Sequence, residues 1–310
     1  MMIMKNNPWK NLKNNSIKRV NFNIPFDIFW AKNSLEQYCY LIRLSNNITL
    51  KKINFKEIQV LYQNGILNEL LIILNDSNNW EIFKILCDDL AENSMLVKTE
   101  KELIEKTYER LNEWKNLLKS TYRDKLSFEE QMGLFTELKT LNNIIFPKIN
   151  SDIAINFWRG ADKDIQDFLC ENSALEVKST LSSKGSIITI SSAFQLETTK
   201  NNLFLIFYSL SQTQNGESIS DIINYIDKKI KNEEIKIKFY KKLFNIGYNL
   251  TETEYDKFRI DKINYYKITD NFPKISSKNL DLRIKEVKYK IDLTFCDSFK
   301  VSKKNLEENI

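Results

Sequence analysis

The sequence predicts a mixed α/β fold in which one helix is followed by three strands, a short helix and a fourth strand. The first support is a capping-box pattern: Ser127 is followed three residues later by Glu130, at the start of a helical pattern that runs to about Leu141. The second is a series of strand-like apolar segments separated by turn residues. These segments are 164–170, 174–180, 186–192 and 203–210. The third is the segment 191–199, which predicts one or two helical turns before the last strand.

Further strands and helices are expected on both sides of this core. Apolar runs bounded by Asn and Ser predict strands, and apolar residues at helical spacing predict helices. On the N-terminal side these are strands at 38–44 and 69–76 and helices at 78–94 and 98–119. On the C-terminal side they are helices at 218–232 and 233–247 and half-buried strands within 258–275 and 284–301. The last residues, 304–310, are expected to fray.

The chain offers few points at which it could divide into independent domains. It has only 6 Gly and 4 Pro, and no Gly/Ser-rich linker or repeat is visible. We therefore expect an N-terminal α/β lobe over 1–120, a core over 121–245 and a C-terminal β-rich extension over 246–310 that packs on the core.

The composition excludes several classes of chemistry. The chain has no histidine, which rules out Ser-His-Asp and Cys-His catalysis, histidine general bases and histidine-containing zinc sites. Its four cysteines are far apart and form no CxxC pair, so we expect core residues rather than disulfides. The net charge of +5 is compatible with a polyanionic partner. No secretion signal and no apolar run of roughly 18 to 20 residues is visible, so we expect a cytoplasmic protein with no membrane partner.

Charged residues interrupt the apolar strands in the middle of the chain, and a catalytic site is expected there. In a strand, residues two apart point to the same face, so Glu176 and Lys178 share one side. If the segment around Asp167 pairs antiparallel with 174–180, Asp167 approaches Glu176 on that side. Such carboxylates repel unless a cation lies between them, and Mg²⁺ or Mn²⁺ suits an all-oxygen site with the Val177 carbonyl as a further ligand. The ion would acidify a bound water, which Lys178 would orient.

Two more side chains could complete this site. Glu137 on the preceding helix could add a carboxylate ligand, and Gln195 after the third strand could hold the water or a phosphate. Simpler interpretations remain open: a buried ion network on the strands, an exposed helix residue at 137 and a turn cap at 195. A second Glu-Val-Lys tripeptide occurs at 286–288, so the tripeptide alone is weak evidence and the combination of residues carries the argument.

Other basic and polar residues could contact phosphates. The weaker candidates, which lie in turns near the expected site, are Arg159, Ser183 and Lys184. The run 228–242 interleaves lysines with aromatic residues and suggests a DNA groove, although a solvated pair of helices is the simpler interpretation.

Short motifs spread over most of the chain carry a family resemblance. In the core they are GLFTEL (133–138), FWRG (157–160), QDF (166–168), LEVKST (175–180) and ISSAFQLE (190–197). Toward the C-terminus they are NIGY (245–248), DNFPKI (270–275) and VKYKIDLTFCDSF (287–299). Together they resemble a bacterial family of uncharacterised proteins assigned to the PD-(D/E)XK nuclease superfamily, whose genes tend to lie in restriction or phage-defence clusters.

The resemblance implies a restriction-endonuclease-like core (α-β-β-β-α-β) with N- and C-terminal embellishments. By resemblance, Asp167, Glu176 and Lys178 form the catalytic core, with Glu137 as the helix carboxylate and Gln195 as the auxiliary polar group. Together with the strand argument above, the expected catalytic residues are Asp167, Glu176, Lys178 and Gln195, and the expected metal ligands are Asp167, Glu176, Val177 and Glu137. Two positions depart from the family's pattern. Gln166 stands where the superfamily has Pro, and Thr136 stands where a small Gly is expected in the helix.

The expected function is therefore a Mg²⁺- or Mn²⁺-dependent DNA endonuclease, or a nuclease subunit, of a restriction or anti-phage defence system. Its expected partners are DNA and other protein subunits of that system, and self-association is also open. The alternative is a catalytically inactive subunit that keeps the nuclease fold and binds nucleic acid or serves as a scaffold.

Overall fold

The computed structural model describes residues 7–20, 23–46, 57–63, 67–121, 126–162, 164–248, 254–277, 280–281 and 283–310. The chain divides into two compact units, each built from two separate segments. Unit 1 comprises residues 1–124 and 236–253, and unit 2 comprises residues 125–235 and 254–310. The chain thus leaves unit 1 and later returns to it, a crossing that no local sequence pattern signals. The three-part division expected from the sequence stays a prediction.

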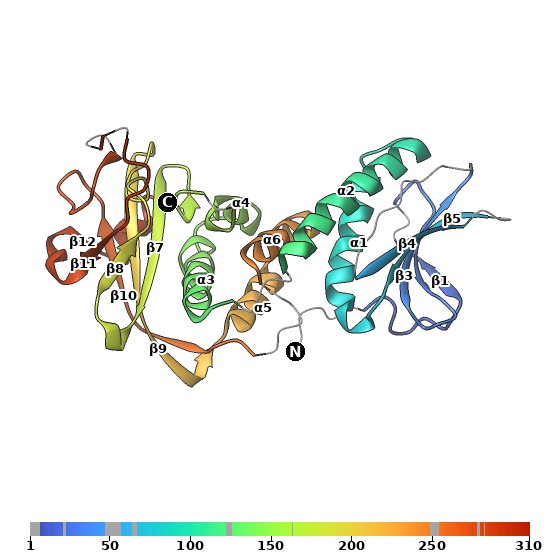
Figure 1. Ribbon diagram of the computed structural model, residues 1–310, viewed down its shortest axis with the longest axis horizontal. Coiled ribbons are helices and arrows are strands. Elements are labelled where there is room, and N and C mark those ends of the chain that lie inside the picture. The colour runs from blue at the N-terminus through green and yellow to red at the C-terminus, as the bar shows by residue number, and fades with distance from the viewer. Residues whose placement is uncertain are drawn as a thin grey trace. The chain divides into compact units, whose positions relative to one another are not determined.

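Unit 1 is built on a five-stranded antiparallel sheet with the strand order β1-β2-β3-β5-β4. Its strands are β1 (Ser16–Arg19), β2 (Ile28–Lys32), β3 (Tyr38–Leu44), β4 (Ile58–Gln63) and β5 (Asn68–Leu74). The helices α1 (Trp80–Ser94) and α2 (Glu100–Thr121) follow, and Figure 1 shows α1 along one face of this sheet. The buried carboxylate of Asp89 on α1 accepts hydrogen bonds from Arg110, Trp114 and Lys241, which ties α1 to α2 and to α6 (Glu233–Ile246).

The sheet of unit 2 has the strand order β12-β10-β9-β7-β6. Its strands are β6 (Phe168–Leu169), β7 (Ser173–Leu181), β9 (Asn202–Glu217), β10 (Phe258–Lys267) and β12 (Lys300–Val301). The strands β7 and β9 pair in parallel, and the other neighbours pair antiparallel. The apolar run predicted at 203–210 lies inside β9, the central strand, where both faces are covered.

Helices cover one side of this sheet. The helix α3 (Phe128–Thr140) begins with the predicted capping box of Ser127 and Glu130 and packs against β7. It continues directly into a five-residue π-helix (Leu141–Ile145), which is followed by α4 (Ser151–Phe157). The helix α5 (Ile219–Lys229) then leads into α6. Figure 1 shows α3 and α4 on one side of β7, with β8 and β10 on the other side.

A two-stranded ribbon covers the opposite face of the sheet. It consists of β8 (Ile187–Ile190) and β11 (Tyr289–Asp292), and its Ile188 and Ile190 share a buried cluster with Leu205 and Phe207 of β9. The third predicted strand is therefore present, but it pairs with β11 and not with β7. Between β7 and β8 the chain passes through a short 3-10 turn that ends at Gly185, whose φ of 76° is a conformation that glycine adopts readily.

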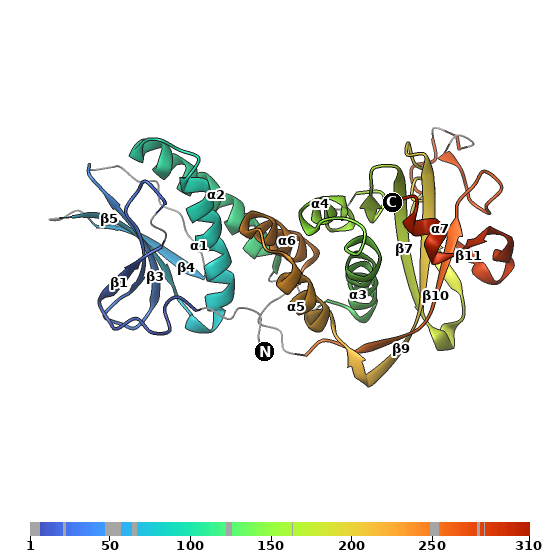
Figure 2. The ribbon, with the colours of Figure 1, turned by 180° about the vertical axis from the view of Figure 1, so that it is seen from behind.

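Several finer expectations were wrong. Residues 191–199 form hydrogen-bonded turns and no helix, as in the bond from the Gln195 N–H to the Ser192 carbonyl. The segment 284–301 is strand only in β11 and β12: residues 284–288 are not in a strand, and two short 3-10 turns separate β11 from β12. The C-terminus does not fray, since α7 (Lys303–Glu307, labelled near β10 in Figure 2) buries Leu306.

Two expectations about the whole chain can be compared with the described residues. The four cysteines are unpaired and buried, as predicted. Within the parts of the chain that the structure describes, none of the helices combines the length and the apolar character that crossing a bilayer requires.

Candidate active site

Glu176 and Lys178 lie in the middle of β7, one strand in from the edge of the unit 2 sheet. The strand β6 pairs antiparallel with β7 and sets Phe168 opposite Leu175. The same register continued by one residue sets Asp167 opposite Glu176, so the predicted antiparallel pairing is present. Glu176 is buried, with 1% exposure, and its Oε1 lies 2.8 Å from the Lys178 Nζ.

The edge of β7 is open at the site because β6 is only two residues long. Beyond that short pairing, the Val177 N–H donates to the Oδ2 of Asp167 at 2.7 Å. The N–H and C=O of one residue in a strand point to the same edge, so the Val177 carbonyl also faces this open edge. The backbone of Asp167 is anchored as well, because its carbonyl accepts hydrogen bonds from the N–H groups of Arg159 (2.7 Å) and Gly160 (3.0 Å).

Glu137 reaches the site from α3. It is half-buried, and its Oε2 accepts a hydrogen bond of 2.7 Å from the indole N–H of Trp158. A Cβ added to Gly160 would lie 2.6 Å from this Oε2 and 2.9 Å from the Oδ1 of Asp167, which is closer than Cβ atoms come to such neighbours. The absence of a side chain at Gly160 therefore allows both carboxylates to border the same small space.

Gln195 approaches Lys178 from the turn after β8. Its Oε1 lies 3.5 Å from the Lys178 Nζ and also accepts a backbone N–H at 2.7 Å. The buried side chain of Gln166 holds this turn, because its Nε2 donates to the carbonyls of Phe194 (3.1 Å) and Glu197 (2.7 Å) on either side of Gln195. The residue that precedes the site aspartate thus positions the segment that carries the site glutamine.

The three carboxylates share a desolvated and strongly anionic environment. Burial, followed by the charge of Asp167, raises the pKa of Glu137 to about 8. Burial also raises the pKa of Asp167 to about 6, against the opposing effect of Lys178. The pKa of Glu176 lies well above its usual value, first through burial and then through Asp167. Burial would lower the pKa of Lys178, but the neighbouring carboxylates outweigh this effect and raise it. One ammonium does not balance three such carboxylates, and a bound cation would.

The oxygen atoms at this site are of the kind that bind a hard divalent cation, but in this structure the described acidic side chains are not close enough together to enclose one. Among the described residues, no three acidic or cysteine side chains surround a point closely enough to hold a metal ion. Two observations support the fit. Both carboxylate oxygens of Glu176 are buried and have no hydrogen-bond partner among the described residues, although Oε1 forms the ion pair with Lys178. The space beside Gly160 is bordered by two further carboxylates. The oxygen donors, which are those that Mg²⁺ and Mn²⁺ prefer, belong to Asp167, Glu176, Glu137 and the Val177 carbonyl.

The weaker candidates lie away from this cluster or have other partners. The Arg159 Nε lies 3.1 Å from the carboxylate of Asp164 in its own loop. Ser183 and Lys184 are exposed in the turn beyond the end of β7. Lys178 is three strand residues from that end, which corresponds to about 10 Å. The structure therefore brings together the side chains of Asp167, Glu176, Lys178, Glu137 and Gln195 with the Val177 backbone. Ser183 and Lys184 lie in the turn beyond β7, and Arg159 adjoins the site through its backbone N–H while its side chain pairs with Asp164.

Three further residues belong to the site through their contacts, although no chemical pattern in the sequence assigns them a role there. Trp158 holds Glu137, Gly160 makes room for two carboxylates, and Gln166 holds the turn that carries Gln195. The available signal was their place in the FWRG and QDF motifs. These motifs indicate a family resemblance, but they do not show which residues Trp158, Gly160 and Gln166 contact.

One family model matches nearly the whole chain. It covers residues 5–294 and is described as "Putative PD-(D/E)XK family member, (DUF4420)". No curated protein and no solved structure matches the chain. The matched range includes all of the site residues described above. The chain therefore belongs to this PD-(D/E)XK-related family, DUF4420.

Proposed function

We propose that this protein is a metal-dependent phosphodiesterase that cleaves DNA, with its catalytic centre at the open edge of β7. One observation carries the proposal: Asp167, Glu176 and Lys178 converge at this edge, and the buried carboxylate of Glu176 forms an ion pair with Lys178 but has no hydrogen-bond partner among the described residues. Membership of a PD-(D/E)XK-related family supports the same reaction class.

The chain's own groups would divide the work of hydrolysis. A bound Mg²⁺ or Mn²⁺ would polarise a phosphoryl oxygen and acidify water. Asp167 is held in place through the Val177 N–H, and Glu137 is held by Trp158, so both carboxylates are positioned before substrate arrives. The Lys178 ammonium would stabilise the negative charge that develops on the phosphoryl group, and the Gln195 amide would orient water or a phosphate oxygen.

The proposal extends to a DNA substrate and to a role in a restriction or anti-phage defence assembly. Its support is the sequence resemblance, whose family tends to be encoded in such clusters, together with a net charge of +5. Partner subunits of the assembly would then supply sequence specificity.

The test is a cleavage assay on plasmid and linear DNA with Mg²⁺ or Mn²⁺. We expect Glu176→Ala and Lys178→Ala to lower the rate by about 100-fold or more, because each removes charge stabilisation at the reacting centre. The chain offers a matched control, since Glu286 and Lys288 occur in the same tripeptide but are exposed. The variants Glu286→Ala and Lys288→Ala should cleave at the wild-type rate, and equal cleavage by all variants would disprove the site assignment.

The second candidate function is a nucleic-acid-binding or scaffolding subunit without catalysis. The observation in its favour is that Lys178 pairs with Glu176 and that no described trio of side chains encloses a metal. This function predicts no cleavage by the wild type with any divalent ion, together with DNA binding that weakens steeply as salt rises.

A purely structural role for the cluster makes a different prediction. If the carboxylates stabilise the fold, Asp167→Asn should unfold the protein. The catalytic proposal expects an inactive variant of normal or higher thermal stability. An Asn side chain can still accept the Val177 N–H, and it removes a carboxylate whose pKa burial has raised to about 6. Thermal denaturation of Asp167→Asn at pH 8 separates the two roles.

A further inference from the structure

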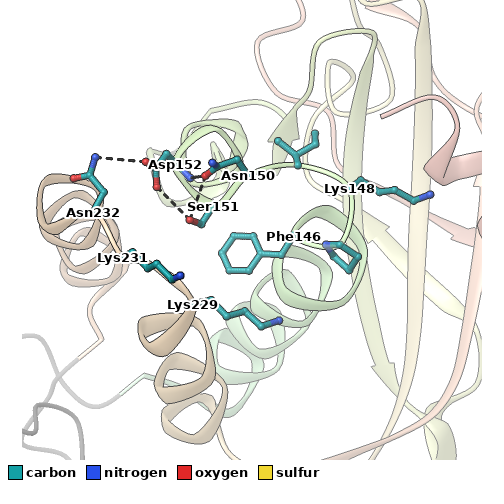
Figure 3. A pocket seen from close by; sticks show the side chains of 10 residues that line it. Phe146, Lys148, Asn150, Ser151, Asp152, Lys229, Lys231 and Asn232 are labelled. Carbon is teal, nitrogen blue, oxygen red and sulfur yellow. Dashed lines mark hydrogen bonds between the residues drawn. The ribbon is translucent and has the colours of Figure 1, made fainter.

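A pocket in unit 2 lies between the α3–α4 connection and the α5–α6 connection, and the proposed reaction does not use it. Its volume is about 770 Å³, within the usual range for small-molecule sites. One wall is formed by residues 146–152 and the other by Lys229, Lys231 and Asn232. Figure 3 shows Phe146 facing the two lysines across this space.

The ring of Phe146 owes its position to the π-helix that precedes it. Its N–H bonds to the Leu141 carbonyl at 2.9 Å, five residues back, so the α-helical path of α3 is widened just before the pocket. Such π segments occur frequently at functional sites. Phe146 is only half-buried, and Pro147 and Ile149 extend the apolar surface beside it.

Positive charge lies next to this apolar surface. The Lys229 Nζ lies 5.7 Å from the centre of the Phe146 ring and is oriented by a hydrogen bond of 2.8 Å to the Asn142 Oδ1. Lys231 is exposed. The third lysine, Lys148, is 3.6 Å from Glu307 and its side chain points away in Figure 3.

The acidic residue of the pocket, Asp152, belongs to the wall opposite the two lysines and already accepts hydrogen bonds. Asp152 accepts hydrogen bonds from the Ser151 hydroxyl (3.2 Å) and from the Asn232 amide (3.4 Å). An anion between Lys229 and Lys231 would therefore meet two cations, while the carboxylate keeps its own donors.

We propose that this pocket binds a nucleotide, with the base against Phe146 and the phosphate between Lys229 and Lys231. An aromatic ring that stacks on a base, beside lysines that contact the phosphate, is the combination that recognises single-stranded nucleic acid. The ligand is a nucleotide unit either of a strand or of a free nucleotide, since both carry the same two groups.

The proposal deepens the proposed nuclease function, because α4 connects the pocket to the loop at Trp158 and Gly160. Seven helical residues span about 10 Å, which is about three nucleotides at 3.4 Å each. A strand whose phosphate lies at the open edge of β7 could thus also occupy the pocket.

The experiment measures binding of a fluorescent single-stranded 12-mer to the full chain in EDTA, over a series of salt concentrations. We expect the Lys229→Ala/Lys231→Ala variant to bind at least 10-fold more weakly. Its slope of log K against log salt should be shallower by about 0.7, because the variant loses the contact with one phosphate of a single strand. Phe146→Leu should weaken binding by about 10-fold and leave the slope unchanged, because it removes stacking but no charge.

The matched control is Lys288→Ala/Lys290→Ala, which removes two exposed lysines of the same unit and should bind like the wild type. Competition with AMP identifies the source: competition favours a free nucleotide, and its absence favours a strand. The proposal is overturned if the Lys229→Ala/Lys231→Ala variant binds the 12-mer with wild-type affinity and slope, or if the wild type binds neither ligand. These measurements need no divalent ion, so a failure of cleavage leaves them unaffected.

Discussion

Replacing Gly160 with alanine tests whether the site depends on the close approach of its carboxylates. The backbone of Gly160 lies outside the left-handed region, so an alanine there is not strained by its φ angle. The added Cβ would instead meet Glu137 Oε2 at 2.6 Å and Asp167 Oδ1 at 2.9 Å. Ordinary contact begins at 3.4 Å, so the two oxygens must retreat by about 0.8 Å and 0.5 Å.

Displacements of this size are small for the fold and large for catalysis. Overpacking of this kind costs about 1–3 kcal/mol of stability, which a domain of this size tolerates. A catalytic group must be held within about 0.5 Å of its productive position, and a misplacement of about 1 Å costs about 100-fold in rate. We therefore expect Gly160→Ala to fold and to cleave DNA 10- to 100-fold more slowly, which corresponds to about 1.4–2.7 kcal/mol of lost transition-state stabilisation.

The assay combines plasmid nicking with Mg²⁺ and thermal denaturation of the same preparation. Gly133→Ala is the matched control, because a Cβ at Gly133 meets no atom within 4 Å and the residue lies in α3. This control should keep full activity and gain up to about 1 kcal/mol of stability, since Ala is the better helix former. A folded Gly160→Ala variant that cleaves at the wild-type rate would refute the assignment of Glu137 and Asp167 to one site.

Two further predictions concern pH and the turn that carries Gln195. The pKa of Glu137 is raised from 4.5 to about 8. Between pH 4.5 and about pH 8, the native protein therefore binds more protons at Glu137 than the unfolded chain does. The free energy of unfolding should fall as pH rises through this range. Glu137→Gln should flatten this decline, and Mg²⁺ should raise the wild-type Tm more at pH 8 than at pH 6 because it competes with protons. A Mg²⁺ shift that is equal at both pH values would contradict the ligand assignment. Gln166→Leu removes both hydrogen bonds to the turn, so we expect kcat to fall about 10-fold with little change in KM for DNA. If kcat falls equally in Gln195→Ala and in the Gln166→Leu/Gln195→Ala double variant, Gln166 acts through Gln195. If the two substitutions lower kcat additively, Gln166 acts independently of Gln195.

The strands and helices that follow local rules were predictable. The capping box at Ser127 opens α3 because its two hydrogen bonds lie within four consecutive residues. Strand periodicity alone places Glu176 and Lys178 on one side of β7. The pairing of β8 was not predictable in the same way, because its partner β11 lies about 100 residues further along the chain. The helical turns expected around Gln195 are absent because Gln166 holds that segment as a turn from outside.

The sequence by itself determined which chemistry this protein can use and which residues on one strand share a face. Because the chain has no histidine, the hydrolysis that we propose would rely on carboxylates, lysine and a bound metal ion, and alternation along β7 places Glu176 and Lys178 on one side. Only the tertiary structure decided that the candidate Glu137 reaches the site, that Trp158 and Gly160 border it, and that Lys229 and Lys231 line a separate pocket. The physical reason is range: periodicity acts over a few residues, whereas these contacts join residues 20 to more than 80 positions apart, and only packing of the whole unit brings them together.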